Sequence, residues 1–330
     1  MQLNTFQGDP FQLISLTHSL NEIPFMPTRL GVLGIFGQEP ITTTDVAIEY
    51  QGETLAMVPN RPRGAPGMTV TPDRQRMRKL TTAHLPTTLS VMADEVQNMR
   101  AFGTESEEAT LQSWLLRKMA VQRRRIDLTL EYHRIGAIKG QVMDSDGTTV
   151  ITDLFNEFNI TKPTLSFGLS SDTTKVNMKV ITLKRMVEDA LGGIPYEYLR
   201  VEASQEWFDA FMSHPGVEDA FADYSSRAFL RTDQRAGFTF SDVLFEEYRG
   251  AVAGTRFVPA GKAYVVPMGV PDLFVQHYAP APYIETVNTL GLPVYAKMFE
   301  HPRSTGYDVE MQSNQLTMCT RPGVLVELSL

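Results

Sequence analysis

Apolar residues recur at helical spacing through one long segment, about residues 107–136. Positions three, four and seven residues apart share one face of a helix, and five large apolar residues follow that spacing. They are Leu111, Leu115, Met119, Ile126 and Leu130. Thr104 followed by Glu107 fits the capping box that begins a helix, and Gly136 and Gly140 fit its end. The pattern predicts a helix of about 30 residues, roughly 45 Å long.

Shorter periodic segments predict the other elements. A helix is expected at about 175–191, ended by two glycines, and another is expected after Ser204, whose hydroxyl can cap it. Strands are expected at about 238–245, 263–266, 294–298, 307–312, 315–320 and 324–328, with turns at 144–147, 313–314 and 322–323. The first thirty-odd residues have scattered apolar positions without a sustained period, which predicts an extended arm.

Strict alternation of apolar or β-branched with other residues marks residues 42–50, and Leu55 to Val58 follow after Gly52. This pattern predicts two strands of an antiparallel ribbon. Residues 59–79 contain four prolines and two glycines and have too little apolar content to fold inward. They are therefore expected to form an extended projecting loop.

The composition places the chain among globular proteins. Of its 330 residues, 42% are hydrophobic and 21% charged, which allows a sizeable core and is too polar for a membrane protein. The length suggests two domains or one elaborated domain. The formal net charge of −8 argues against a protein whose main task is to bind phosphates.

Charge is segregated along the chain. Residues 61–79 carry six basic side chains, and residues 201–226 carry six acidic side chains and no Lys or Arg. The acidic residues are Glu202, Glu206, Asp209, Glu218, Asp219 and Asp223. Opposite charges of this kind could steer one subunit onto the next, although two ordinary solvated faces would give the same pattern. The run Arg123–Arg125 is likewise expected on a solvated face, with contact to nucleic acid or an acidic neighbour as the alternative.

The sequence predicts no catalytic, cofactor-binding or metal-ligating residues. Residues 260–263 lack the first glycine and the hydroxyl of a phosphate-binding loop, and the six histidines are dispersed. Asp144 and Asp146 do not complete a calcium loop. Cys319 stands alone and is expected to be a buried small apolar residue. Because catalytic groups can converge from distant positions, a hydrolase or nucleotide-using enzyme stays open as an alternative.

Several segments, in order, resemble the lambda-type phage major capsid (head) protein E family. In the first part of the chain these are DVAIE at 45–49, LAMVP at 55–59 and RGAPG at 63–67. In the last part they are FVPAGKA at 257–263, ETVNTLGLPVYAK at 285–297, QSNQL at 312–316 and RPGVLV at 321–326. The resemblance spans roughly residues 30–330 and thins between about 160 and 250.

The resemblance implies the Hong Kong 97-type capsid fold, of class α+β, with five parts. Residues 1–40 would form an N-terminal arm, 41–90 an extended E-loop, 91–194 a peripheral domain with a long spine helix, 195–290 an axial domain, and 291–330 the C-terminal strands of the peripheral domain. The acidic residues named above would then lie in the axial domain. The loop tip would contact a neighbouring subunit through Arg61, Arg63, Gly64, Pro66, Gly67, Arg74 and Arg76.

The function implied is that of the major capsid protein of a tailed double-stranded DNA bacteriophage, which self-assembles into an icosahedral shell. The expected partners are copies of itself in hexamers and pentamers, a separate scaffolding protein, the portal and packaged double-stranded DNA in non-specific contact; a decoration protein is also compatible. The separate scaffold is expected because few residues precede the E-loop. Assembly would occur in the host cytoplasm and the product would be the virion capsid, with no cofactor. Another phage or encapsulin-like shell protein, or a tail protein, stays open as an alternative.

Overall fold

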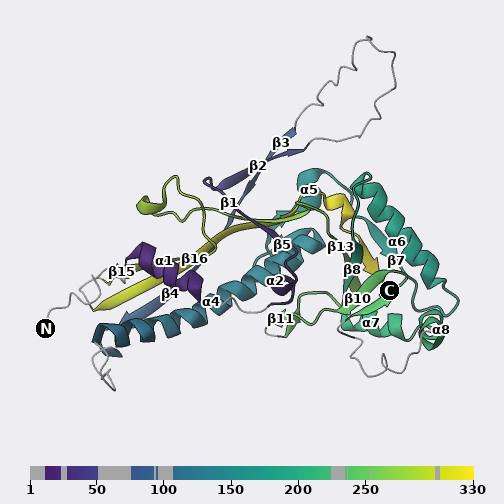
Figure 1. The fold of residues 1–330 in the computed structure, drawn as a ribbon, viewed down its shortest axis with the longest axis horizontal. Coiled ribbons are helices and arrows are strands. Elements are labelled where there is room, and N and C mark those ends of the chain that lie inside the picture. Colours follow the sequence, from purple (N-terminus) through teal and green to yellow (C-terminus); the bar gives the residue numbers. More distant parts are fainter. Residues whose placement is uncertain are drawn as a thin grey trace, which may run out of the picture.

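The computed structural model describes residues 12–23, 28–50, 76–92, 94–95, 107–223, 235, 237–252, 254–301 and 305–330. These residues form two large sheets, and one long helix, α4 (Glu107–Lys139), runs from beneath the first sheet toward the second (Figure 1). Helices and strands are mixed as an α+β class requires. The arrangement is elongated, with the C-terminus in the second sheet.

The first sheet has five strands and packs on α4. Its order is β1-β14-β16-β15, and β4 also pairs with β16 along ten residues of each strand. The bounds are β1 Gly37–Pro40, β4 Ala83–Met92, β14 Phe274–Tyr278, β15 Tyr295–Glu300 and β16 Gly306–Cys319. Because β4 and β16 lie more than 200 residues apart in sequence, this pairing joins the first third of the chain to the last.

The predicted long helix is confirmed by α4, which has 33 residues. Four residues of its predicted stripe are buried in one cluster with residues of α1 (Leu13–Glu22) and of the first sheet. These four are Leu115, Met119, Ile126 and Leu130. Thr104 and the side chain of Leu111 lie outside the described part of the chain.

The second sheet has six strands in the order β7-β17-β13-β8-β10-β9. Its strands are β7 Thr164–Ser166, β8 Tyr198–Ala203, β9 Phe238–Phe240, β10 Val243–Glu247, β13 Lys262–Met268 and β17 Glu327–Ser329. Helices α6 (Val176–Leu191), α7 (Gln205–Met212) and α8 (Pro215–Asp223) lie beside it. On one face, Trp207 stacks on both Phe211 and Phe245 in the larger core.

The two shorter predicted helices are confirmed. Helix α6 ends at Gly192, whose φ of 66° is a left-handed conformation that glycine adopts without steric cost. Ser204 caps α7 by accepting a hydrogen bond from the Trp207 backbone amide. Both ends are set by residues next to the helix in sequence, which is why local patterns predicted them.

The remaining elements are short. A two-stranded ribbon of β2 and β3 leaves the body of the molecule, as Figure 1 shows. The bounds are α2 Arg29–Leu33, β2 Asp45–Tyr50, β3 Arg76–Thr81, β5 Gln141–Met143, β6 Val150–Asp153, α5 Leu154–Phe158, β11 Ala251–Val252, β12 Thr255–Arg256, η5 Ile284–Thr286 and η7 Pro322–Val324. Strands β5 and β6 confirm the predicted hairpin around 144–147.

The expected extended arm is wrong for residues 13–22, which form α1, and for residues 29–33, which form α2. Leu16 and Leu20 are buried against α4 and β15, and Thr17 exchanges hydrogen bonds with the backbone of Ala296. The helix has only ten residues, too few for a strong periodic signal, and tertiary contacts stabilise it.

Three strand predictions are corrected. Strand β2 pairs with β3 instead of residues 55–58, which lie outside the described part, so 76–79 belong to a strand and not to the loop. The expected strand at 238–245 is a hairpin, because Ser241 and Asp242 both have positive φ. The expected turn at 313–314 is absent, since β16 runs straight through it.

Candidate functional site

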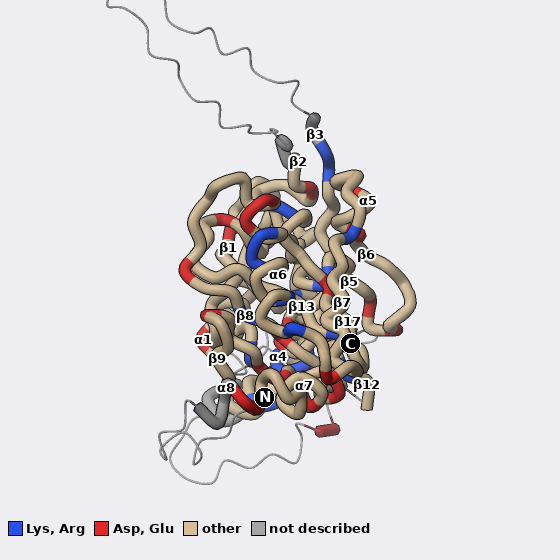
Figure 2. The backbone as a smooth tube through the Cα atoms, turned by 90° about the vertical axis from the view of Figure 1, so that its right-hand side faces the viewer, with Lys and Arg blue, Asp and Glu red and all other residues tan. Residues whose placement is uncertain are grey.

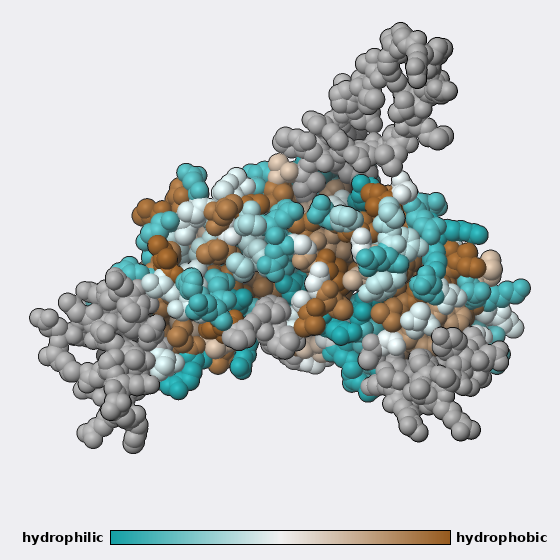
Figure 3. Space-filling view, viewed as in Figure 1, coloured by the Kyte–Doolittle hydropathy of each residue, from teal (hydrophilic) through white to brown (hydrophobic). Residues whose placement is uncertain are grey.

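The loop between β14 and β15 exposes apolar side chains at several neighbouring positions. Ile284 is 90% exposed, Val287 64% and Leu290 60%, and Leu292 is also exposed. We call residues 281–293 with these four side chains the apolar platform. Brown apolar atoms interrupt the polar surface over this loop in Figure 3. Exposed apolar residues usually occur singly, so a group of four within nine residues is a candidate interaction surface.

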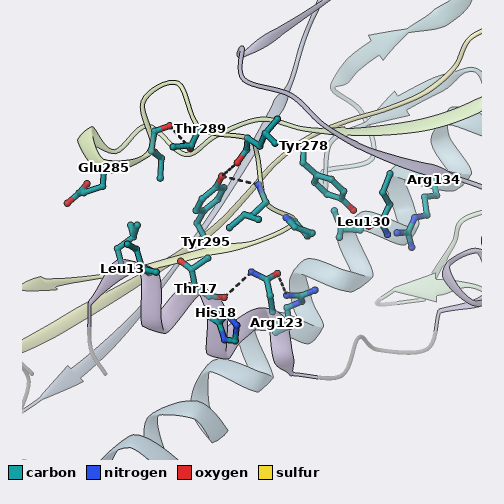
Figure 4. Close-up of a pocket in the computed structure, with 17 residues that line it drawn as sticks. Leu13, Thr17, His18, Arg123, Leu130, Arg134, Tyr278, Glu285, Thr289 and Tyr295 are labelled. Carbon is teal, nitrogen blue, oxygen red and sulfur yellow. Dashed lines mark hydrogen bonds between the residues drawn. The ribbon is translucent and has the colours of Figure 1, made fainter. Parts of the chain in front are cut away.

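Polar side chains hold the platform in one shape from within. The buried Thr286 hydroxyl bonds to the carbonyls of Ala281 and Tyr283, at 2.5 and 3.0 Å. The Tyr295 hydroxyl accepts a hydrogen bond from the Leu292 amide at 2.9 Å (Figure 4). Gly291 lies so close to Tyr278 that a Cβ atom would come 2.0 Å from its carbonyl oxygen. The exposed apolar groups are therefore carried on an ordered loop.

A groove of about 610 Å³ lies between the platform, α1 and α4. Figure 4 shows Leu13 and Thr17 of α1 on one side and Tyr295 with Thr289 on the other. The lining is mainly apolar and includes Ile14, which is 78% exposed. Groove and platform together form one apolar face at this end of the molecule.

Arg123 at the edge of this groove is buried, so its expected place on a solvated face is wrong. Its guanidinium pairs with Asp127 at 3.0 Å and donates to the Leu20 carbonyl at 3.4 Å and to the Asn21 side chain. Arg124 and Arg125 are exposed as expected. Consecutive residues of a helix point in different directions, and only Arg123 lies on the face of α4 that α1 covers.

A second group of charged side chains lies beside the second sheet, three of them buried and the fourth, Arg29, 44% exposed. We call Arg29, Arg200, Glu202 and Glu246 the charged cluster. Arg29 holds both oxygens of Glu246, each at 2.5 Å, and Arg200 bonds to Glu246 and to Glu202. Glu202 and Glu246 are register partners on adjacent parallel strands, which places their carboxylates side by side. Burial, more than any charge nearby, raises the pKa of Glu202 to about 7.

The acidic segment is only partly a surface. Glu202 is fully buried in the charged cluster, so its expected place among inter-subunit acids is corrected. Glu206, Asp209, Glu218 and Asp219 are exposed, and Glu206 pairs with Arg256 at 2.6 Å. The side chain of Asp223 lies outside the described part. Side chains alternate between the two faces of β8, so the Glu202 side chain points away from the aromatic core. It is buried because other elements cover that second face.

The basic loop is mostly outside the described residues. This holds for Arg61, Arg63, Gly64, Pro66, Gly67 and Arg74, whereas Arg76 begins β3 without a described side chain. Arg78 and Lys79 colour β3 blue in Figure 2. They pair within the chain, Lys79 with Asp45 at 2.9 Å and Arg78 with Glu157 at 3.9 Å.

The described residues offer no group of three or more His, Cys, Asp or Glu suited to a metal ion. Cys319 is buried as expected, and burial raises the pKa of its thiol to about 12, far from that of a nucleophile. None of the helices in the described ranges is long and apolar enough to cross a membrane.

Two features of the structure had no sequence signal that identified them. The platform overlaps the segment ETVNTLGLPVYAK at 285–297, and its residues Ile284, Val287 and Leu290 are spaced three apart, a pattern that does not distinguish exposed from buried side chains. The charged cluster joins residues up to 217 positions apart and left no local signal.

Comparisons with known proteins all find phage capsid proteins. The family described as phage major capsid protein E matches residues 12–330. The major capsid protein of Salmonella phage Felix O1 is 28% identical over 361 residues, covering 99% of this chain and 98% of that protein. The major capsid protein of Pseudomonas phage KPP10 is 28% identical over 339 residues, covering 96% of each.

A solved structure is similar over nearly its whole length. The putative capsid protein of a prophage of E. coli CFT073 superposes with a TM-score of 0.53 at 13% identity, covering 97% of this chain and 99% of that one. At this identity the likeness concerns the fold.

Proposed function

The chain belongs to the phage major capsid protein E family, and from that premise we propose which of its surfaces join one copy to the next. It is the major capsid protein of a tailed phage, has the Hong Kong 97-type fold, and assembles with copies of itself into the viral capsid. The apolar platform is the surface we assign first to contact with a neighbouring copy.

The observation that carries this assignment is a row of apolar side chains exposed on an internally hydrogen-bonded loop. The Thr286 and Tyr295 hydroxyls bond within the loop, whereas Ile284, Val287 and Leu290 are exposed beside the polar residues Glu285, Asn288 and Thr289. A loop that only connects two strands would not need exposed apolar groups on an ordered frame. A preordered apolar surface loses little entropy when a partner covers it, which suits a subunit that must meet copies of itself repeatedly.

Replacing Val287 and Leu290 together by aspartate should abolish shell formation and leave the subunit folded. Both side chains are more than half exposed, so the charges cost little in the free subunit and much once a neighbour covers them. Particle yield by electron microscopy and sedimentation would measure assembly, and thermal melting of the subunit would measure folding. The matched control replaces Met178 and Val252, two exposed apolar residues outside the platform, by aspartate. Normal particles from the platform variant would refute the assignment.

We also propose an electrostatic contact between copies. Arg61, Arg63, Gly64, Pro66, Gly67 and Arg74 would lie at the tip of the loop beyond the β2–β3 ribbon, and Arg76 lies at the end of that ribbon. Their counterpart would be the exposed acids Glu206, Asp209, Glu218 and Asp219 together with Asp223. The opposite net charges and the projecting ribbon support this pairing.

Reversing Arg61, Arg63 and Arg74 to glutamate should impair shell assembly with subunit folding largely intact. The change removes three positive charges and adds three negative ones on a segment expected to project. The lysine variant at the same three positions keeps the charge and should assemble. Equal particle yields from the glutamate and lysine variants at low ionic strength would show that the loop charge is incidental.

The division of the chain into parts is likewise a proposal. Residues 1–40 would form the arm, 41–90 the E-loop, 91–194 with 291–330 the peripheral domain, and 195–290 the axial domain. The projecting ribbon and the packing of α4 on β4 and β16 support it. Strand β14 falls in the axial range but pairs with β1 and β16, so the chain crosses between the parts there.

The family is one of structural capsid proteins, and we propose that the subunit has no catalytic site. We further propose that a separate scaffolding protein directs assembly in the host cytoplasm into hexamers and pentamers of an icosahedral shell. The portal, a decoration protein and packaged double-stranded DNA in non-specific contact would be its other partners.

A further inference from the structure

The charged cluster fastens the N-terminal segment to the second sheet. Arg29 of α2 is bidentate to Glu246 on β10, and the neighbouring Leu30 amide donates to Glu131 of α4 at 2.7 Å. Leu30 itself is buried. We propose that Arg29 and the buried carboxylates form a clasp that holds residues 28–33 in place and loosens when Glu202 takes up a proton.

The cluster balances two guanidinium groups against two carboxylates. Arg200 is 3% exposed and is held within the sheet by both carboxylates, whereas Arg29 is 44% exposed and bonds only to Glu246 among the four. When Glu202 is protonated, two cations are left with one anion, Glu246. Arg29 is more exposed and less constrained than Arg200, so it is the group whose bonds to Glu246 weaken.

The hydrogen bonding of Glu202 favours its protonated form. One of its oxygens accepts from Arg200 at 2.5 Å, and the other, fully buried, has no hydrogen-bond donor in the described part of the chain. A buried ionised oxygen without a donor is costly, and a proton on it removes that cost. The raised pKa of Glu202, about 7, agrees with this geometry.

Coupling between the two groups must be reciprocal. Burial raises the pKa of Glu202, and the Arg29 charge partly opposes that rise. The hydrogen bond to Glu246 is the main cause of the raised pKa of Arg29, and the Glu202 charge adds to it. A cation that favours the ionised carboxylate is itself held less firmly once that carboxylate is neutral. Glu202 lies on β8 beside Arg200 and stays there when Arg29 separates, so the coupling to Arg29 sets the sign: acid weakens the clasp, and alkali strengthens it.

The charged groups that act on Glu202 in the described structure are the other members of the charged cluster. Arg200 lies on its own strand, Glu246 on β10 and Arg29 on α2. Tyr264 is its register partner on β13, but the hydroxyl of that tyrosine bonds to Glu327. Tyr248 bonds to Glu131 on α4, and Arg134 pairs with the same glutamate at 3.6 Å.

Hydrogen exchange of the full-length unassembled subunit tests the clasp. Protection of the amides in residues 29–34, corrected for intrinsic exchange, should fall at least about fivefold between pH 8 and pH 5.5. In Glu202→Gln, which imitates the protonated side chain, protection should be low at both pH values. In Arg29→Gln it should also be low and independent of pH.

Two controls distinguish an effect of the charged cluster from loss of any glutamate and from unfolding. Glu300→Gln changes an exposed glutamate far from the cluster in sequence and should behave as the unaltered chain. Protection in α6 reports whether each variant is folded, because Val180, Leu183 and Val187 lie in the main core. Protection of residues 29–34 that stays constant with pH in the unaltered chain, or varies equally in folded Glu202→Gln, would overturn the proposal.

Discussion

Replacing Leu115 by aspartate should remove about 4–6 kcal/mol from the free energy of unfolding, a large part of what typical domains possess. The side chain is 1% exposed and lies in the cluster formed by α4, α1 and the first sheet. The change removes apolar contacts, leaves a cavity and places a carboxylate where no described neighbour in that cluster offers a charge. Chemical denaturation followed by circular dichroism would measure the loss.

Val121→Asp on the same helix is the matched control. Val121 is 50% exposed, so its aspartate stays in water and should cost less than about 1 kcal/mol. The comparison separates burial from the weaker helix propensity of aspartate, which both variants share. Equal unfolding midpoints for the two variants would contradict the packing of α4 described above.

Replacing Arg200 by methionine should cost about 3–5 kcal/mol, because it leaves a buried carboxylate without its cation. Glu202 would lose the Arg200 side chain, its hydrogen-bond donor in the described structure, and Glu246 would keep Arg29. Thermal or denaturant unfolding at pH 8 would measure the change. At pH 5.5 the loss should be smaller, since Glu202 can then be protonated.

A double variant, Arg200→Met with Glu202→Leu, tests the reason for that loss. It removes one cation and one anion together and leaves Arg29 paired with Glu246, so most of the stability should return. Arg185→Met, at an exposed position of α6, is the control for loss of an arginine and should change little. A double variant as unstable as the single one would show that packing of the arginine stem, not charge balance, decides the effect.

The sequence alone predicted the elements whose signals are local. The stripe of α4, the cap at Ser204 and the left-handed end at Gly192 each depend on residues within a few positions of one another. These helix features are fixed by backbone geometry and short-range bonds. The family also followed from the sequence, because short segments in the same order survive where whole-chain identity to relatives is low. The burial of Cys319 was expected from its residue type alone.

Only the tertiary structure decided which of these residues are covered and which are exposed. Leucine is buried in α1 at positions 16 and 20 and exposed in the platform at position 290, and glutamate is exposed at position 206 and buried at position 202. Strand partners such as β2 with β3, and the meeting of Arg29 with Glu246, join residues 26 to more than 200 positions apart. Burial and charge pairing depend on what packs against a side chain, and that neighbour comes from elsewhere in the chain or from another copy of it.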